Sequence, residues 1–150
     1  MNFKEQVYEH CRQLINKKIS LLSRTLEELK ESSSNETKST AGDKHETALA
    51  MLQIEQENTG RQLKEAREQQ LLFGKIDITV KTSYVIHGSL IKTNRGWLFL
   101  SVALGRIKLD DGITAIALSP QSPLGKQLLG LRVRDAADVN NIQYIVEYIV

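Results

Sequence analysis

The sequence of 150 residues contains few of the residues that cross-link or interrupt a chain. Cys11 is the only cysteine, so no disulfide bond forms within the chain, and a lone cysteine on a helix is typically a small core residue. Proline occurs only at Pro120 and Pro123, and residues 1–41 contain neither proline nor glycine. The opening of the chain is therefore free of the residues that break helices.

Long apolar runs and a strong charge of one sign are also missing. No segment has the ~20 consecutive apolar residues that a membrane span requires, and the first residues contain no apolar core of a signal peptide. We therefore expect a cytoplasmic protein. The net charge of +2 is small, whereas a dedicated DNA-binding domain usually has a strongly basic face. The three histidines are scattered and show no zinc-site spacing with the single cysteine.

Apolar residues at intervals of three or four predict two long helices in the first half of the chain. The stripe in residues 3–33 consists of Tyr8, Cys11, Ile15, Ile19, Leu22, Leu26 and Leu29. A weaker stripe covers residues 44–72, and the Ser/Thr/Asn-rich segment 32–42 between them favours a turn. Because each helix has one apolar side, residues 1–73 are predicted to form an antiparallel coiled-coil hairpin.

The second half, residues 74–150, changes to β-forming segments separated by turn residues. These segments are residues 76–80, 84–86, 90–91, 97–104, 113–118 and 142–150. One short helix is expected among them, with Ser122 as the N-cap, Pro123 at the first helical position and Gly130 after the last turn. The whole chain is therefore predicted to be an α+β protein, a helical hairpin followed by a small antiparallel sheet domain with one helix.

Two acidic residues, Asp43 and Glu46, occur where the second helix is expected to begin, and we call residues 43–46 the acidic tip. Their spacing matches a capping box, in which both side chains only stabilise the helix start. Their position at the end of a hairpin also allows a second interpretation. Carboxylates there can be delivered into a partner's site, and Mg²⁺ accepts such oxygen ligands when the partner supplies the remainder.

Two motifs resemble the GreA/GreB family of transcript cleavage factors. Asp43-x-x-Glu46 after a first long helix resembles the acidic tip of that family. Residues 116–130 look like its C-terminal signature, a strand that leads into S-P-L-G-x-x-L-L-G. The signature residues are Ser122, Pro123, Leu124, Gly125 and Gly130. The Tyr-Ile-Val strand at residues 144–146 also matches, so the resemblance covers nearly the whole chain.

The resemblance implies a transcription elongation factor that is not itself an enzyme and has no cofactor of its own. Its FKBP-like C-terminal domain would dock at the secondary channel of RNA polymerase, and the coiled coil would enter the channel. Asp43 and Glu46 would then help to hold Mg²⁺ in the polymerase active site, so that backtracked RNA is cleaved. Lys38 and Lys44 would contact the nascent RNA, and DNA of the elongation complex is a further expected partner.

The tip departs from the family pattern, which keeps alternatives open. The family reads D-x-S-E-N, and here His45 and Thr47 replace the serine and the asparagine. One alternative is therefore a Gre-like regulator that binds RNA polymerase without promoting cleavage. An FKBP-like domain also suggests a prolyl isomerase, for which Trp97 and Phe99 are available aromatic residues. The last alternative is a coiled-coil adaptor whose tip acids are helix caps only.

Overall fold

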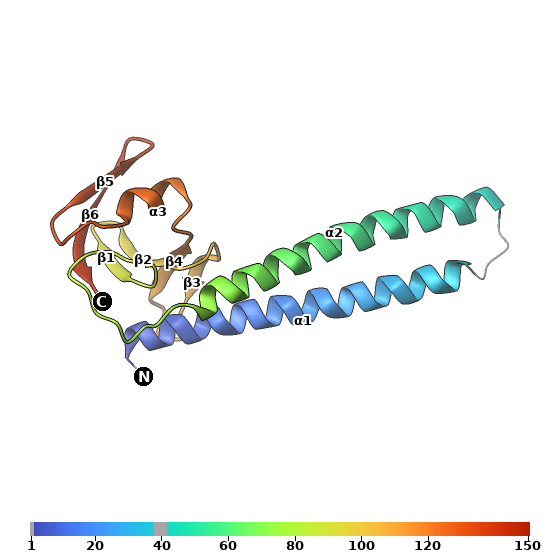
Figure 1. The fold of residues 1–150 in the computed structure, drawn as a ribbon, viewed down its shortest axis with the longest axis horizontal. Coiled ribbons are helices and arrows are strands. Elements are labelled where there is room, and N and C mark those ends of the chain that lie inside the picture. Colours follow the sequence, from blue (N-terminus) through green and yellow to red (C-terminus); the bar gives the residue numbers. More distant parts are fainter. Residues whose placement is uncertain (1, 38–41) are drawn as a thin grey trace. The chain divides into compact units, whose positions relative to one another are not determined.

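Two long helices form the first half of the chain. The computed structural model describes residues 2–37 and 42–150, without the side chains of residues 36, 37 and 42–44. Helix α1 covers Phe3–Thr37 and helix α2 covers Gly42–Gly74. Figure 1 draws α1 in blue and α2 in green. Both expected helices are confirmed. Helix α1 continues beyond its predicted end, and α2 exceeds its predicted bounds at both ends.

The apolar stripe of each helix lies on its buried side. Every residue of the predicted α1 stripe is buried or half-buried, whereas Leu14 and Leu21, outside that stripe, are 37% and 54% exposed. In α2, Leu63 and Ala66 are buried and Glu55 is exposed. Burial of one side of each helix is the main source of stability for helices of this length, because helix propensity alone contributes little.

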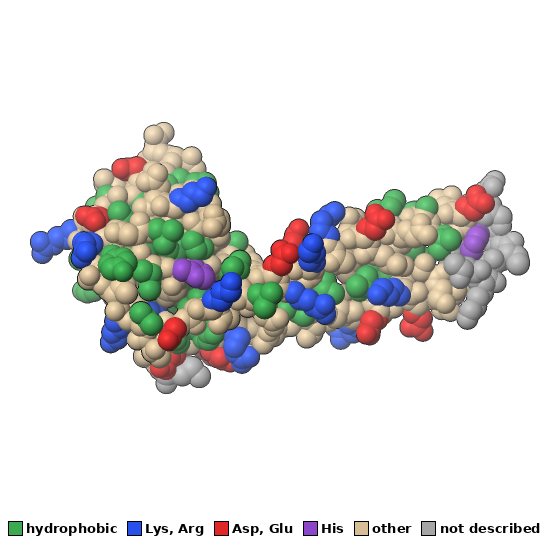
Figure 2. All heavy atoms as spheres, in the orientation of Figure 1, with side chains coloured by type: hydrophobic (Ala, Val, Ile, Leu, Met, Phe, Trp, Pro, Cys, Tyr) green, Lys and Arg blue, Asp and Glu red, His purple; other side chains and the backbone are tan. Residues whose placement is uncertain are grey.

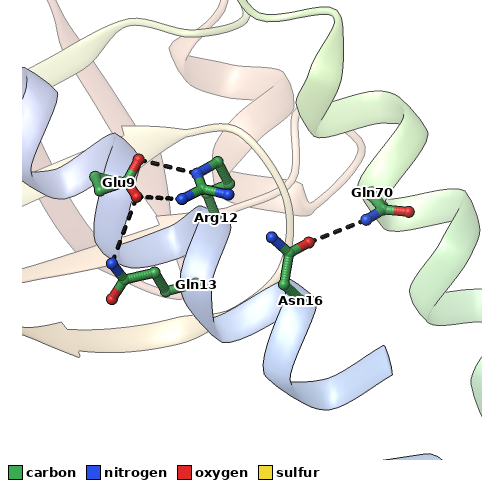
Figure 3. Close-up of polar contacts among 5 residues, drawn as sticks. All are labelled: Glu9, Arg12, Gln13, Asn16 and Gln70. Atoms are coloured by element: carbon green, nitrogen blue, oxygen red, sulfur yellow. Dashed lines mark hydrogen bonds and ion pairs between the residues drawn. The ribbon is translucent and has the colours of Figure 1, made fainter. Parts of the chain in front are cut away.

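Hydrogen bonds between the two helices fix their antiparallel pairing. The side-chain amide of Gln56 donates to the carbonyl oxygen of Leu29 at 3.2 Å. The amide of Gln70 donates to the Asn16 side-chain oxygen at 3.0 Å, as Figure 3 shows. The second bond therefore lies further along α2 but further back along α1, by nearly the same length of chain. Such matched steps in opposite directions are the register of an antiparallel hairpin.

Contacts along the chain define two compact units. One unit contains Leu14–Gln70, which is the hairpin proper, and the other contains Met1–Gln13 together with Leu71–Val150. These units divide the chain differently from the expected domains of residues 1–73 and 74–150. The start of α1 and the end of α2 are therefore built into the unit that holds the sheet. None of the helices in the described residues combines the length and apolar character needed to cross a bilayer.

A six-stranded sheet and one short helix form the second half of the chain. The elements are β1 Leu90–Thr93, β2 Gly96–Leu100, β3 Gly105–Lys108, β4 Thr114–Leu118, α3 Pro123–Leu128, β5 Ala136–Val139 and β6 Ile142–Ile149. The strand order across the sheet is β3-β4-β2-β1-β6-β5. The chain is thus α+β, with a helical hairpin followed by a small sheet domain, as the sequence predicted.

The sheet is mixed, which corrects the expectation of an antiparallel sheet. Strands β2 and β4 pair in parallel, with Trp97 opposite Ala115 and Leu100 opposite Leu118. The cause is the path of the chain. After β2 it leaves a place open and forms β3 at the sheet edge, and the β3–β4 hairpin then returns β4 into that place. The other strand pairs are antiparallel.

One apolar core lies between the sheet and α3. It contains Val85, Ile91, Leu98, Leu100, Leu118, Leu128, Ala137 and Val146. A second group of buried side chains joins the helix ends to the sheet. Tyr8 stacks on Phe73 with ring centroids 4.6 Å apart, and Phe73 meets Phe99 edge-on at 6.3 Å. Val7 and Cys11 are fully buried in the same unit. These contacts explain why the start of α1 belongs with the sheet.

Two segments predicted as strands are not strands. Residues 76–80 form a turn, in which the Asp77 carboxylate accepts a hydrogen bond from the Thr79 backbone N–H at 2.9 Å. An aspartate that bonds the backbone two residues on offers the chain an alternative to sheet pairing. In residues 84–86, only Tyr84 makes a β-bridge, an isolated one to Arg132.

Candidate functional site

The acidic tip lies in the first turns of α2. The helix already includes Gly42, so Asp43 is its second residue, two positions further in than the N-cap position of a capping box. Asp43 and Glu46 are three residues apart on a helical backbone, and positions with this spacing share one face of a helix. Both are near the N-terminal end of the helix, where the helix dipole favours negative charge.

Of the four predicted tip and contact residues, Glu46 is the one whose side chain the structure describes, and it is exposed. The side chains of Asp43 and Lys44 and the whole of Lys38 lie outside the described residues. His45, between the two acids, is half-buried. The backbone thus brings both predicted positions to one helix face, and of the two side chains the structure describes Glu46, which is exposed.

The position of Glu46 on α2 keeps it far from the end of that helix. At the rise of an α-helix, Gly74, the last residue of α2, lies about 42 Å further along the helix axis than Glu46.

Figure 2 shows acidic and basic side chains interspersed along the hairpin on the face that is drawn. A mixed surface of this kind is typical of a solvated helix pair and does not by itself attract nucleic acid.

One charged cluster on α1 illustrates how these exposed side chains pair. Figure 3 shows the Glu9 carboxylate accepting hydrogen bonds from the side chains of Arg12 and Gln13. The hydrogen bond and charge of Arg12 lower the pKa of Glu9. All three side chains come from adjacent turns of one helix, so the cluster is a local surface network that screening weakens. It gives no indication of a catalytic site.

The S-P-L-G signature residues form the start and end of α3. The Ser122 hydroxyl accepts from the Gly125 backbone N–H at 3.0 Å and donates to the Ser119 carbonyl oxygen at 2.7 Å. Pro123 occupies the first helical position, as predicted. Gly130 has φ +84°, a conformation that favours glycine, and its N–H donates to the Val85 carbonyl oxygen at 2.8 Å.

The remaining signature residues are fixed by packing. Gly125 is buried, and a Cβ there would lie 2.0 Å from the Ser119 carbonyl oxygen. Leu124 packs against the core that contains the fully buried Leu128. Each signature residue therefore has a structural role in seating α3 on the sheet, and none of them presents a reactive group.

The described residues contain neither a reactive cysteine nor a group of metal-binding side chains. Cys11 is buried, and burial raises the pKa of its thiol to about 12, so the thiolate that acts as a nucleophile is suppressed. Among the side chains that the structure describes, no three histidine, cysteine or acidic residues gather in a group that could hold a metal ion. Among the described side chains of the acidic tip, Glu46 offers the oxygen ligand type that Mg²⁺ prefers.

Sequence reasoning missed a cationic cavity in the sheet-containing unit, which includes Lys4, Lys81 and Trp97 in its wall. A signal was present in the sequence. Lys4 lies four residues before Tyr8 and therefore continues the apolar stripe of α1. A lysine on the buried side of a helix needs an explanation, because lysine is almost never fully buried without a partner.

The fold and the tip define a class of protein, a two-helix hairpin with an exposed acidic residue near its turn, joined to a small mixed-sheet domain. No family model and no curated protein matches the sequence. Among solved structures, the chain is similar to the transcription factor Gfh1, with 16% identity over 92% of each chain and a TM-score of 0.37. A second similar structure is the GreA factor homolog 1 (Gfh1) protein of Thermus thermophilus, with 18% identity over 88% of this chain and 94% of that chain and a TM-score of 0.32. Identities and scores this low leave the function to be argued from the residues of this chain.

Proposed function

We propose that the chain is a Gre-type transcription elongation factor that binds RNA polymerase and stimulates cleavage of backtracked RNA. The observation that carries the proposal is the exposed Glu46, in the first turns of a 33-residue helix and on the same helix face as Asp43. Glu46 is an exposed acid near the start of a long helix, and among the described side chains no metal-binding group forms around it. It can complete a site on another protein.

The S-P-L-G motif supports the same proposal from the other end of the chain. Its residues match the Gre-type signature and form a capped helix seated on the sheet. In the proposed complex, this domain docks at the rim of the polymerase secondary channel and the hairpin enters it. RNA polymerase is then the partner, with nascent RNA and template DNA nearby, and the cytoplasm is the compartment in which they meet.

In this function the chain supplies ligands rather than catalysis of its own. Asp43 and Glu46 would offer carboxylate oxygens to a magnesium ion of the polymerase, and Lys38 and Lys44 would contact RNA. A magnesium ion there would stabilise the attacking and leaving oxygens of phosphodiester cleavage. In the proposed complex the hairpin would carry both acids into the channel, and positions three residues apart on a helix share one face from which both could reach one site.

A second function is favoured by the tip sequence. His45 and Thr47 stand where Gre-type factors have serine and asparagine, and such a change affects the residues that flank both acids. The chain would then be a regulator that occupies the polymerase channel without promoting cleavage. Both functions require polymerase binding, and they differ in whether RNA is cut.

Transcript cleavage in stalled complexes tests the proposal. Purified RNA polymerase is halted in a backtracked state on end-labelled RNA, and the chain is added with Mg²⁺. We expect a shortened RNA and resumed elongation with the parent protein, and loss of both with Asp43→Asn. Glu57→Gln is the matched control, because it changes an exposed acid further along α2, and it should retain activity.

The outcomes separate the two functions. Slowed elongation without a short RNA product would support the regulator and reject cleavage stimulation. No effect on polymerase, together with no binding of labelled chain to polymerase, would reject both. Far-UV circular dichroism of each variant shows that the helices are intact.

A further inference from the structure

A cavity of about 470 Å³ lies in the unit that contains the sheet and the start of α1. This volume is within the range of small-molecule sites, about 300–1,000 Å³. Its wall is mostly apolar and includes Phe3, Ile78 and Trp97. The cavity is separate from the acidic tip, and nothing in the proposed function uses it.

Two aromatic rings form one side of the cavity. The ring centroids of Phe3 and Trp97 are 4.9 Å apart, with their planes tilted by 56°. Both residues are half-buried, so part of each ring remains available. Lys92 lies on Trp97 as well, with its Nζ 6.0 Å from the ring centroid. Tilted aromatic rings with free surface are suited to contact with a flat apolar or aromatic body.

The cavity also carries positive charge. Lys4 and Lys81 both line it, and no acidic side chain is among the described residues that do so. Lys4 is only 5% exposed, and its Nζ donates to a main-chain oxygen of Val150 at 2.7 Å. Burial lowers the pKa of Lys4, and the charge of Lys81 lowers it further, while Asp77 acts in the opposite direction. A buried ammonium beside a second one is stabilised when an anion approaches.

We propose that this cavity binds a small aromatic molecule that carries one negatively charged group. The aromatic body contacts Phe3 and Trp97, and the anionic group lies near the ammonium groups of Lys4 and Lys81. The apolar residues of the wall account for the apolar part of the ligand, and the two lysines that line the cavity account for the anion. A carboxylate, sulfonate or phosphate group can pair with the same two lysines. The proposed class of ligand is therefore defined by one negatively charged group and an aromatic ring.

A pair of matched probes tests this proposal. 8-Anilinonaphthalene-1-sulfonate has an aromatic body and one negative charge, and N-phenyl-1-naphthylamine has the same rings without the sulfonate. Trp97 is the only tryptophan and lines the cavity, so energy transfer from it reports a probe bound in its vicinity, and the Lys81→Met variant below assigns that binding to the cavity. We expect one sulfonate probe per folded chain, with energy transfer, and weaker binding of the uncharged probe.

The exposed Lys81 provides a variant that should fold normally. Lys81→Met is expected to weaken binding of the sulfonate probe about threefold or more and to leave the uncharged probe unchanged, because it removes one ionic contact. Lys126→Met removes an exposed lysine of α3 that does not line the cavity, and it is the matched control. It should bind both probes as the parent does.

Three results would overturn the proposal. The first is that Lys81→Met and Lys126→Met weaken binding of the sulfonate probe equally. The second is that the parent binds both probes with equal affinity, and the third is that no energy transfer from Trp97 is observed. RNA cleavage by the same protein is a separate measurement, and its failure leaves this test unaffected.

Discussion

Gly125 has no room for a side chain, and this makes it the most demanding residue of the S-P-L-G motif. A Cβ would lie 2.0 Å from the Ser119 carbonyl oxygen and 2.9 Å from the Pro120 Cα, and both are backbone atoms. Backbone cannot move aside as a flexible side chain can. We expect Gly125→Ala to lower the free energy of unfolding by about 3 kcal/mol, within the usual cost of overpacking. Denaturant unfolding followed by Trp97 fluorescence measures it.

Gly60 is the matched control, because an added Cβ there meets nothing within 4 Å. It lies in the interior of α2, where alanine is favoured over glycine by about 1 kcal/mol. Gly60→Ala should therefore leave the protein as stable as the parent or stabilise it. Equal stability of the Gly125→Ala protein and the parent would show that the close contact at α3 is not present in solution.

Cys11 is a core residue whose thiol should be inert. Burial raises the pKa of this thiol from 9.0 to about 12, so the folded state holds the proton more tightly than the unfolded state. The associated stability is present below pH 9 and is lost as the pH rises from about 9 towards 12. We expect no reaction with a thiol reagent at pH 8 until denaturant is added. Rapid reaction of the native protein would contradict the buried position.

The two helices of the hairpin are held by a narrow apolar seam. Leu63 is 7% exposed, whereas Leu21 is 54% exposed on the opposite helix. Leu63→Ala should lower the free energy of unfolding of the hairpin by about 2–3 kcal/mol, because it removes buried methyl groups and leaves a cavity. Leu21→Ala should change it by less than about 0.5 kcal/mol. Thermal unfolding followed by far-UV circular dichroism compares them, and equal effects would refute the assigned seam.

At the scale of elements, the sequence predicts those helices and strands whose apolar pattern is long or whose end residues are distinctive. Both long helices followed from spacing that persists over most of their length, and α3 followed from Ser122, Pro123 and Gly130, which have defined positions in a capped helix. Strands β2, β4 and β6 were found because their apolar residues are numerous. In each case the local pattern and the final packing agree.

The strands that the sequence did not predict are short, and they are held in place by the strands beside them. Strands β3 and β5 have four residues each and lie at the two edges of the sheet, and each contains one fully buried side chain, Ile107 and Ala137. Four residues with one apolar contact give no periodic signal. The reverse error occurred at residues 76–80, where β-forming residues were present but the hydrogen bond from Thr79 to Asp77 formed a turn.

For the whole molecule, the sequence predicted the order of the parts better than their boundaries. The segment Met1–Gln13 belongs to the unit with the sheet, because Val7 and Cys11 are buried there and Tyr8 stacks on Phe73. Helical spacing alone cannot tell in which unit those side chains pack. One apolar stripe can contact the other helix along part of its length and the sheet along another part. The cavity beside Lys4 was missed for the same reason, because it is formed by residues distant in sequence.

The candidate site was predictable in part. The sequence identified the Asp43 and Glu46 pair, and the helical backbone places both on one face. The side-chain exposure is described for Glu46, while Lys38 lies outside the described residues. In the proposed function the acids bind a magnesium ion in RNA polymerase. The other ligands of that ion belong to the polymerase, so neither the sequence nor the isolated fold of this chain contains them. A functional measurement with that partner is needed.

The dependence of RNA cleavage on magnesium tests the central claim most directly. Cleavage of backtracked RNA by polymerase is measured over a range of Mg²⁺ concentrations with the parent, Glu46→Gln and the control Glu57→Gln. If Glu46 supplies a metal ligand, Glu46→Gln should raise the half-saturating Mg²⁺ concentration by about tenfold or more, and Glu57→Gln should match the parent. The same magnesium dependence for all three proteins, or no cleavage with the parent, would contradict the claim.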